Sequence, residues 1–287
     1  LDLYLSPDRV LPVMGSRGCY WEKCAFCSIP FDHMTFHVRY AENVVNDFKT
    51  LQKKYNCNNF FFTDEALPIN FLRTFAAKII EQKVDVQWTG ELKFEKSLLK
   101  DDRMDLLYKS GCRKLIFGLE SYNQRVLDSM KKGVELSWVD ETAERCMQLG
   151  IAMHFYLICG FPTETREEVM DSINFVLNNQ RLLDSPGFSA ILSQFDLERG
   201  APIENNPMEW GITKLYTPPE HDLSLGYSYE TSIGMNAEET NELYQQLIEK
   251  LGREVMTFPH NYSLSDGLLY LAHHQKNSLT ERLGALA

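Results

Sequence analysis

The sequence predicts an α/β fold, a partial (β/α)6 TIM-like barrel with a C-terminal extension of mainly helix and loop. Apolar runs rich in β-branched and aromatic residues alternate with segments of helical periodicity from Val10 to Phe195, where the alternation ends. Strand–helix repeats of this kind predict parallel strands joined by crossover helices. Six repeats, rather than eight, favour an incomplete barrel. A doubly wound open sheet is the alternative, because periodicity alone does not distinguish the two architectures.

The expected strands are short apolar runs, and the first of them enters a glycine-containing turn. In chain order they are expected at 10–14, 59–62, 84–89, 114–119, 151–158 and 188–195. In either architecture, polar residues at the carboxyl ends of these strands are the candidate site residues.

The helices between these strands are identified by an apolar face or by end signals. The first has Val44, Val45, Phe48 and Leu51 on one side. Gly111 and Gly150 mark two helix ends, since glycine is common just after the last turn. Ser137 begins a capping pattern, and Thr165 with Glu168 forms a capping box. The expected helices are 41–55, 70–82, 97–110, 137–149 and 165–178.

The C-terminal part of the chain has a different composition. Residues 196–236 are rich in Pro, Gly, Asn and Tyr and are expected to form loops. The segment 238–251 has leucines at four-residue spacing, which predicts an amphipathic helix, and 263–274 is a second helix candidate. We therefore expect a barrel domain at 1–195 and an extension at 196–287 that contributes to substrate binding.

Composition and charge exclude several classes of protein. Forty acidic residues against 29 basic ones give a net charge of −11, whereas nucleic-acid binding needs clustered Lys and Arg. No apolar run approaches the ~20 residues that a helix needs to cross a bilayer. The cysteine spacing does not indicate a secreted disulfide framework, and no signal peptide is recognisable. We expect a cytoplasmic protein that binds neither nucleic acid nor membrane. The chain begins at Leu1 without a methionine, as a piece of a longer protein would.

The strongest chemical signal is a loop with three cysteines, Cys19, Cys24 and Cys27, directly after the first expected strand. Three thiolates this close can converge on a soft metal centre. A structural zinc takes four ligands, and His33 or His37 could supply the fourth. A [4Fe–4S] cluster held by only three cysteines instead keeps one iron open to a substrate or cofactor.

The segment Ser16-Arg-Gly-Cys19…Cys24-Ala-Phe-Cys27 resembles the signature of radical S-adenosylmethionine (SAM) enzymes. It is most similar to the subset that usually carries a cobalamin-binding domain ahead of the barrel. The resemblance covers roughly residues 4–200. The family's common spacing is C-x3-C-x2-C, whereas four residues separate Cys19 from Cys24 here. We expect the extra residue to enlarge the loop without changing the number of ligands.

The resemblance implies that the three cysteines hold a [4Fe–4S] cluster whose open iron binds SAM through its amino and carboxylate groups. The enzyme would cleave SAM reductively and modify an unactivated carbon centre of a small-molecule or peptide substrate. An electron donor such as flavodoxin or ferredoxin would supply the electron. Cobalamin-dependent methyl transfer to carbon is a further expectation for a full-length protein, with cobalamin bound by a domain absent from this chain. Two alternatives are a zinc-stabilised module without catalysis and a scaffold that binds SAM without cleaving it.

The same resemblance assigns SAM contacts to the ends of the first strands. Phe26, between the second and third cysteines, is expected near the adenine. Asp64 and Glu65 follow the second strand, and either of them would accept hydrogen bonds from the SAM amino group. An acid that favours the following helix N-terminus is the alternative interpretation of this pair.

Two later turns are assigned in the same way. Glu120, with Ser121, is expected near the ribose hydroxyls, although Gly-Leu-Glu-Ser also occurs in ordinary strand-to-helix turns. Gly160 lies in a turn that is expected to let the backbone approach the nucleoside. The Pro162 and Thr163 that follow would equally suit a helix start.

Overall fold

The computed structural model describes residues 9–29, 35–217 and 224–254. Its centre is a six-stranded sheet in the order β1-β4-β5-β6-β7-β8, in which every neighbouring pair is parallel. The strand order follows the chain without reversal, whereas a doubly wound sheet reverses its order at a switch point. The partial TIM-like barrel is therefore confirmed and the doubly wound alternative is wrong. The strands are β1 (Val10–Val13), β4 (Asn59–Phe62), β5 (Gln87–Leu92), β6 (Cys112–Glu120), β7 (Ala152–Cys159) and β8 (Ser189–Gln194).

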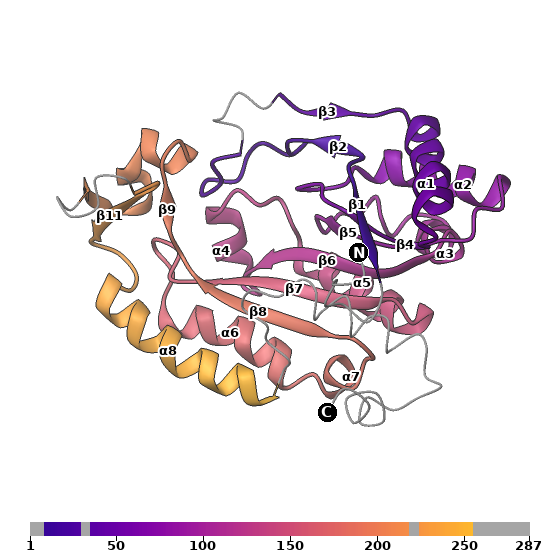
Figure 1. Cartoon of the computed structure of the whole chain (residues 1–287). Helices are drawn as coiled ribbons and strands as arrows, with labels where there is room; N and C mark the ends of the chain where they lie inside the picture. The colour runs from indigo at the N-terminus through magenta and orange to yellow at the C-terminus, as the bar shows by residue number, and fades with distance from the viewer. Residues whose placement is uncertain (1–8, 30–34, 218–223, 255–287) are drawn as a thin grey trace, which may run out of the picture.

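Helices connect these strands and pack on the outside of the sheet (Figure 1). The five expected helices are present. The short helices α4 and α7 were not expected, since four to six residues carry no measurable hydrophobic periodicity. In chain order the helices are α1 (Ala41–Tyr55), α2 (Ile69–Glu81), α3 (Arg103–Lys109), α4 (Gln124–Ser129), α5 (Leu136–Leu149), α6 (Arg166–Leu177) and α7 (Gln180–Leu183).

The largest errors in the expected boundaries are at β5 and α3, and one expected helix cap is also wrong. Strand β5 spans 87–92 rather than 84–89, because the backbone N–H of Val84 still bonds to Ile79 at the end of α2. Helix α3 begins at Arg103 rather than at 97, because the preceding residues form turns that include Asp101 at a φ of 56°. Helix α5 begins at Leu136 after Glu135, so Ser137 is not its cap. The capping box of Thr165 and Glu168 is confirmed.

The main core lies between the sheet and its helices. Aromatic rings from α1, β4 and β5 form its densest part: the Phe48 and Phe60 rings stack with centroids 4.1 Å apart, and Phe62 meets Trp88 edge-on at 5.6 Å. The end of α3 requires a glycine, since Gly111 has a φ of 98° and a Cβ there would lie 2.0 Å from the carbonyl oxygen of Val86. The expected glycine stop therefore fixes how α3 enters β6.

The segment 196–236 is not a set of loops, as the composition predicted, but contains a small antiparallel sheet of order β10-β11-β9. Its proline and glycine content concealed the short strands, and two 3-10 helices begin at Pro202 and Pro207. The elements are β9 (Leu197–Glu198), η1 (Pro202–Asn205), η2 (Pro207–Trp210), β10 (Ile212–Tyr216) and β11 (Gly226–Thr231). A further two-stranded pair, β2 (Ser16–Arg17) with β3 (His37–Val38), flanks the cysteine loop.

Helix α8 (Ala237–Glu254) contains the expected C-terminal helix. Its Leu243, Leu247 and Leu251 are buried in the main core, and the helix lies along α6 and β8 (Figure 1). The second helix candidate, 263–274, lies outside the described residues. Among the described helices, none combines the length and the apolar character needed to span a membrane.

Candidate functional site

A cavity of ≈ 170 Å³ opens where the central strands of the barrel end. One wall is the cysteine loop, which contributes Cys19, Trp21, Cys24, Phe26, Cys27 and Ile29. The rest of the polar lining comes from the residues after β4, from the ends of β5 and β6, and from β7: Glu65, Glu91, Lys93, Glu120 and Tyr156, with Lys132 from the turn after α4. Carboxyl ends of barrel strands are where such folds place their active sites.

The three cysteines share this cavity as free, half-buried thiols. Burial raises the pKa of Cys27 to about 11, and it raises the pKa of Cys24 although the charge of Lys132 opposes it. The raised pKa keeps the Cys24 and Cys27 thiols protonated at neutral pH, and a bound metal centre would displace those protons. No three His, Cys, Asp or Glu side chains within the described ranges are already arranged as a metal site. The donor set itself, three free thiols on one cavity wall, fits a cluster with three thiolate ligands.

The zinc alternative needs a fourth ligand near these cysteines. His37 is exposed in β3, where it pairs with Arg17, and it is not part of the cavity wall. His33 lies outside the described residues.

The adjacent acids after β4 have different surroundings. The carboxylate of Asp64 is 3% exposed and accepts hydrogen bonds from Gly15 N at 2.9 Å, from Ser16 Oγ at 2.6 Å and from Ser16 N. Asp64 thus ties β4 to the start of the cysteine loop and does not line the cavity. Glu65 lines it. Burial raises the pKa of Glu65, and the neighbouring charge of Asp64 adds to the effect.

A buried ion pair in the cavity wall joins β6 to the turn after α4. Lys132 Nζ lies 2.6 Å from Glu120 Oε1, and both side chains are about one-tenth exposed. Burial lowers the pKa of Lys132, but the Glu120 carboxylate, together with the charges of Cys24 and Cys19, makes the net shift upward. Lys132 Nζ also lies 5.7 Å from the centroid of the Phe26 ring. Glu120 has a φ of 64° at a register shift between β6 and β7, which marks an irregular strand end.

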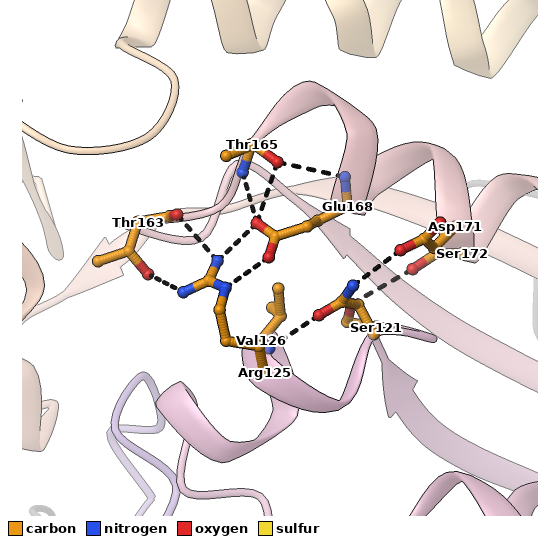
Figure 2. Close-up of polar contacts among 9 residues, drawn as sticks. Ser121, Arg125, Val126, Thr163, Thr165, Glu168, Asp171 and Ser172 are labelled. Atoms are coloured by element: carbon orange, nitrogen blue, oxygen red, sulfur yellow. Dashed lines mark hydrogen bonds and ion pairs between the residues drawn. The ribbon is translucent and has the colours of Figure 1, made fainter.

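Ser121 and Gly160 are not part of the cavity wall. The hydroxyl of Ser121 lies 3.3 Å from that of Ser172 on α6, so it faces the helix layer (Figure 2). The N–H of Gly160 donates to Glu164 at 2.7 Å, and a Cβ at Gly160 would lie 2.1 Å from Cγ2 of Thr240 in α8. The Gly160 turn therefore packs against the C-terminal helix.

The cavity is also lined by Glu91, Lys93, Tyr156 and Lys132, none of which was predicted from the sequence. Tyr156 donates to Glu91 at 3.2 Å. Burial raises the pKa of Glu91 to about 7 and the charges of Glu65 and Glu120 add to it, although the Tyr156 hydrogen bond opposes it. Burial, together with the charge of Lys132, lowers the pKa of Lys93 to about 8, although Glu95 opposes it. Glu91 and Lys93 were missed because the predicted strand ended at residue 89, whereas β5 continues to Leu92. The alternation of charged residues at 91, 93 and 95 could have indicated that the strand continues.

A family model for the radical SAM superfamily matches residues 13–176, which is more than half of the chain. The chain belongs to the radical SAM superfamily. The expected resemblance is confirmed, and the matched residues include the cysteine loop and the strands that form the cavity.

Among curated relatives, an uncharacterized methyltransferase of Pyrococcus horikoshii is 28% identical over 57% of this chain and 36% of its own length. Bacteriochlorophyllide d C-12(1)-methyltransferase of Chlorobaculum tepidum is 24% identical over 64% of this chain and 40% of its own length. The match therefore spans well under two thirds of the length of either relative.

Solved structures of radical SAM proteins share the fold. The methyltransferase TsrM from Kitasatospora setae, with cobalamin and a [4Fe–4S] cluster bound, aligns over 94% of this chain and 58% of its own with a TM-score of 0.66 and 16% identity. The cobalamin-dependent radical SAM enzyme OxsB, with aqua-cobalamin bound, aligns over 92% of this chain and 50% of its own with a TM-score of 0.60 and 12% identity. The radical SAM fold thus extends through most of this chain, including residues C-terminal to Phe195.

A polar network joins α4 to the start of α6 (Figure 2). The guanidinium of Arg125 donates to both carboxylate oxygens of Glu168, which also belongs to the α6 capping box. The same guanidinium donates to the carbonyl of Thr163 at 3.0 Å and to its hydroxyl at 3.2 Å. Thr163 has a φ of 79°, so these bonds hold a turn that its side chain disfavours.

Proposed function

We propose that this chain is the catalytic part of a radical SAM enzyme that holds a [4Fe–4S] cluster through Cys19, Cys24 and Cys27 and cleaves SAM reductively to modify an unactivated carbon centre. The observation that supports it is the shared cavity, which is lined by three free thiols, by carboxylates and by two lysines at the barrel mouth. When bound, the cluster supplies the electron that breaks a C–S bond of the SAM sulfonium, giving methionine and a 5′-deoxyadenosyl radical.

The residues of this chain supply binding, orientation and exclusion of water. Glu65 would accept hydrogen bonds from the α-amino group of SAM, and Lys132 would bind its carboxylate. Glu120 would accept from the ribose hydroxyls with the oxygen that Lys132 does not occupy, and Phe26 would pack against the adenine. Leu92 and Ala66 complete an apolar lining that keeps water from the reacting centre.

In this proposal, three other predicted site residues support the cavity walls without contacting SAM. Asp64 joins the start of the cysteine loop to β4 by hydrogen bonds, and Ser121 packs β6 against α6. Gly160 has no side chain and so leaves room for α8 beside the end of β7. Each orders a wall of the cavity without reaching into it.

For a protein in which this chain is joined to a cobalamin-binding domain, we propose methyl transfer to carbon that depends on cobalamin. The support is the set of relatives named as methyltransferases and the fold shared with TsrM and OxsB, whose structures contain cobalamin. The substrate would be a small molecule or peptide, and residues 196–287 would help to select it. A flavodoxin or ferredoxin would donate the electron.

Anaerobic reconstitution with iron and sulfide tests the first step, and about four irons and four sulfides per chain are expected. Addition of dithionite and SAM should then yield 5′-deoxyadenosine. Cys24→Ala should abolish both results, whereas Cys146→Ala, at a buried thiol in α5, should abolish neither. One tightly bound zinc in place of the cluster would favour the non-catalytic module. A cluster that binds SAM without cleaving it would reject the activity.

A further inference from the structure

The turn that carries Lys132, residues 129–133, is held by hydrogen bonds to almost every carbonyl in it. Trp210 Nε1 donates to Ser129 O at 3.0 Å, and Ala25 N donates to Met130 O at 2.8 Å. The donors come from the C-terminal extension and from the cysteine loop respectively, so the turn joins two parts of the chain that are far apart in sequence.

Trp21 of the cysteine loop holds the other half of the turn. Its Nε1 donates to Lys131 O at 2.9 Å. Its ring lies directly on Gly133, where a Cβ would come within 2.1 Å of ring atom Cζ2. Lys93 Nζ lies 4.2 Å from the Trp21 ring centroid and donates to Gly133 O at 2.5 Å. Trp21 belongs to the four-residue stretch between Cys19 and Cys24, the stretch that is one residue longer than the common spacing.

Trp210 holds the turn from the side of the C-terminal extension. Lys131 Nζ lies 4.5 Å from the Trp210 ring centroid and pairs with Glu209 at 2.9 Å. The extension also reaches the cysteine loop itself, because Ile203 N donates to Ala25 O at 2.9 Å. A second apolar core lies beneath these contacts and includes Ala25, Val126, Met130, Ile203 and Trp210.

We propose that Trp21 and Trp210 are positioning residues that clamp the 129–133 turn and thereby set where Lys132 presents its ammonium group to the cofactor's carboxylate. The proposal rests on the SAM-binding role proposed above for this cavity. Trp21 bonds the carbonyl of the peptide group that precedes Lys132, and Trp210 bonds the carbonyl of Ser129 at the start of the turn. Both tryptophans therefore act on Lys132 through the backbone of the turn. The long Lys side chain would otherwise lose several rotamers on binding an anion, so a fixed backbone and the Glu120 contact raise the affinity by preorganisation.

The conservative variants Trp21→Phe and Trp210→Phe keep a ring and remove the indole N–H that holds the turn. Trp138→Phe is the matched control, since Trp138 lies on α5 and does not line the cavity. Equilibrium dialysis measures the dissociation constant of the anaerobically reconstituted enzyme for SAM and for decarboxylated SAM, which keeps the amino group and lacks the carboxylate. Iron content and the EPR spectrum of the reduced cluster, with and without SAM, are recorded in parallel.

We expect each clamp variant to bind SAM about fivefold more weakly, the order expected for losing one hydrogen bond. Its affinity for decarboxylated SAM, its iron content and its cluster spectrum without SAM should match the wild type. Equal weakening for both nucleosides would show a general structural role and overturn the proposal, as would unchanged SAM affinity.

Gly133→Ala is a second probe of the same clamp, because the added Cβ must displace the Trp21 ring. It should weaken SAM binding at least as much as Trp21→Phe and again spare decarboxylated SAM. Wild-type enzyme that fails to bind SAM at all would instead reject the proposed function, an outcome distinct from the variant results.

Discussion

The Nζ of Lys132 and the Oε1 of Glu120 form a 2.6 Å ion pair between a turn and an irregular strand end, with both side chains about one-tenth exposed. Two charges removed from water are stable there only as a pair, because the loss of either partner leaves the other buried and uncompensated. The pair is thus a structural element of the cavity wall as well as the proposed contact of SAM.

Lys132→Met should therefore destabilise the protein by about 3 kcal/mol, the usual effect of breaking a buried pair from one side. The double variant Glu120→Gln/Lys132→Met should be more stable than Lys132→Met alone, because it leaves no isolated charge. Chemical denaturation of the three proteins measures this. Equal stability of the single and double variants would contradict a coupled pair.

The fold of this chain was more predictable than its cavity. All six barrel strands and the five expected barrel helices follow from hydrophobic periodicity, glycine stops and capping patterns. Helix α4 is six residues long, too short for such a signal, and Lys132 lies just beyond it. The small antiparallel sheet was missed because prolines and glycines recur around its short strands and indicate loops.

Neighbouring residues at a strand end cannot be separated by sequence alone. Asp64 and Glu65 differ in role because Gly15 and Ser16, nearly fifty residues earlier, supply the N–H groups that bind one of them. The cysteine trio needed no such long-range information, since its ligands lie within one loop. Glu91 was not predicted as a site residue because β5 ends at Leu92, three residues beyond its predicted end.

Asp64 and Glu65 offer a matched pair of variants. Asp64→Asn places an amide N–H₂ among hydrogen-bond donors, so we expect a loss of about 1–3 kcal/mol in the free energy of unfolding. Glu65→Gln should change stability by less than about 0.5 kcal/mol, as for most exposed positions. It should weaken SAM binding about tenfold, because a charge-assisted hydrogen bond to the amino group is lost. Thermal unfolding measures the effect on stability, and equilibrium dialysis measures the effect on SAM binding. If Asp64→Asn weakened SAM binding and Glu65→Gln reduced stability, the two assigned roles would be wrong.

Glu91 should make stability depend on pH. Its pKa is raised to about 7 in the folded protein, mainly by burial, from an ordinary value of 4.5. Between these two values the folded state binds more protons than the unfolded state, so stability should fall as the pH rises from about 4.5 to 7. Glu91→Gln removes this titration and should flatten the profile by about 2 kcal/mol over that window. Urea denaturation of both proteins at pH 5 and pH 8 measures the difference. If the stability of the two proteins changed equally between these pH values, the group with the raised pKa would not be Glu91.

The contact between Gly160 and Thr240 makes the docking of α8 testable. Gly160 has a φ of 85°, and a Cβ there would lie 2.1 Å from Thr240 Cγ2. Gly150 has a similar φ of 71° with nothing within 4 Å of its Cβ position, so Gly150→Ala isolates the backbone strain of about 1–2 kcal/mol. Gly160→Ala should lose a further 1–3 kcal/mol or so, the range for overpacking. Adding Thr240→Ala should recover most of that excess in thermal denaturation. Equal losses for the two glycine variants would show that α8 does not press on the Gly160 turn.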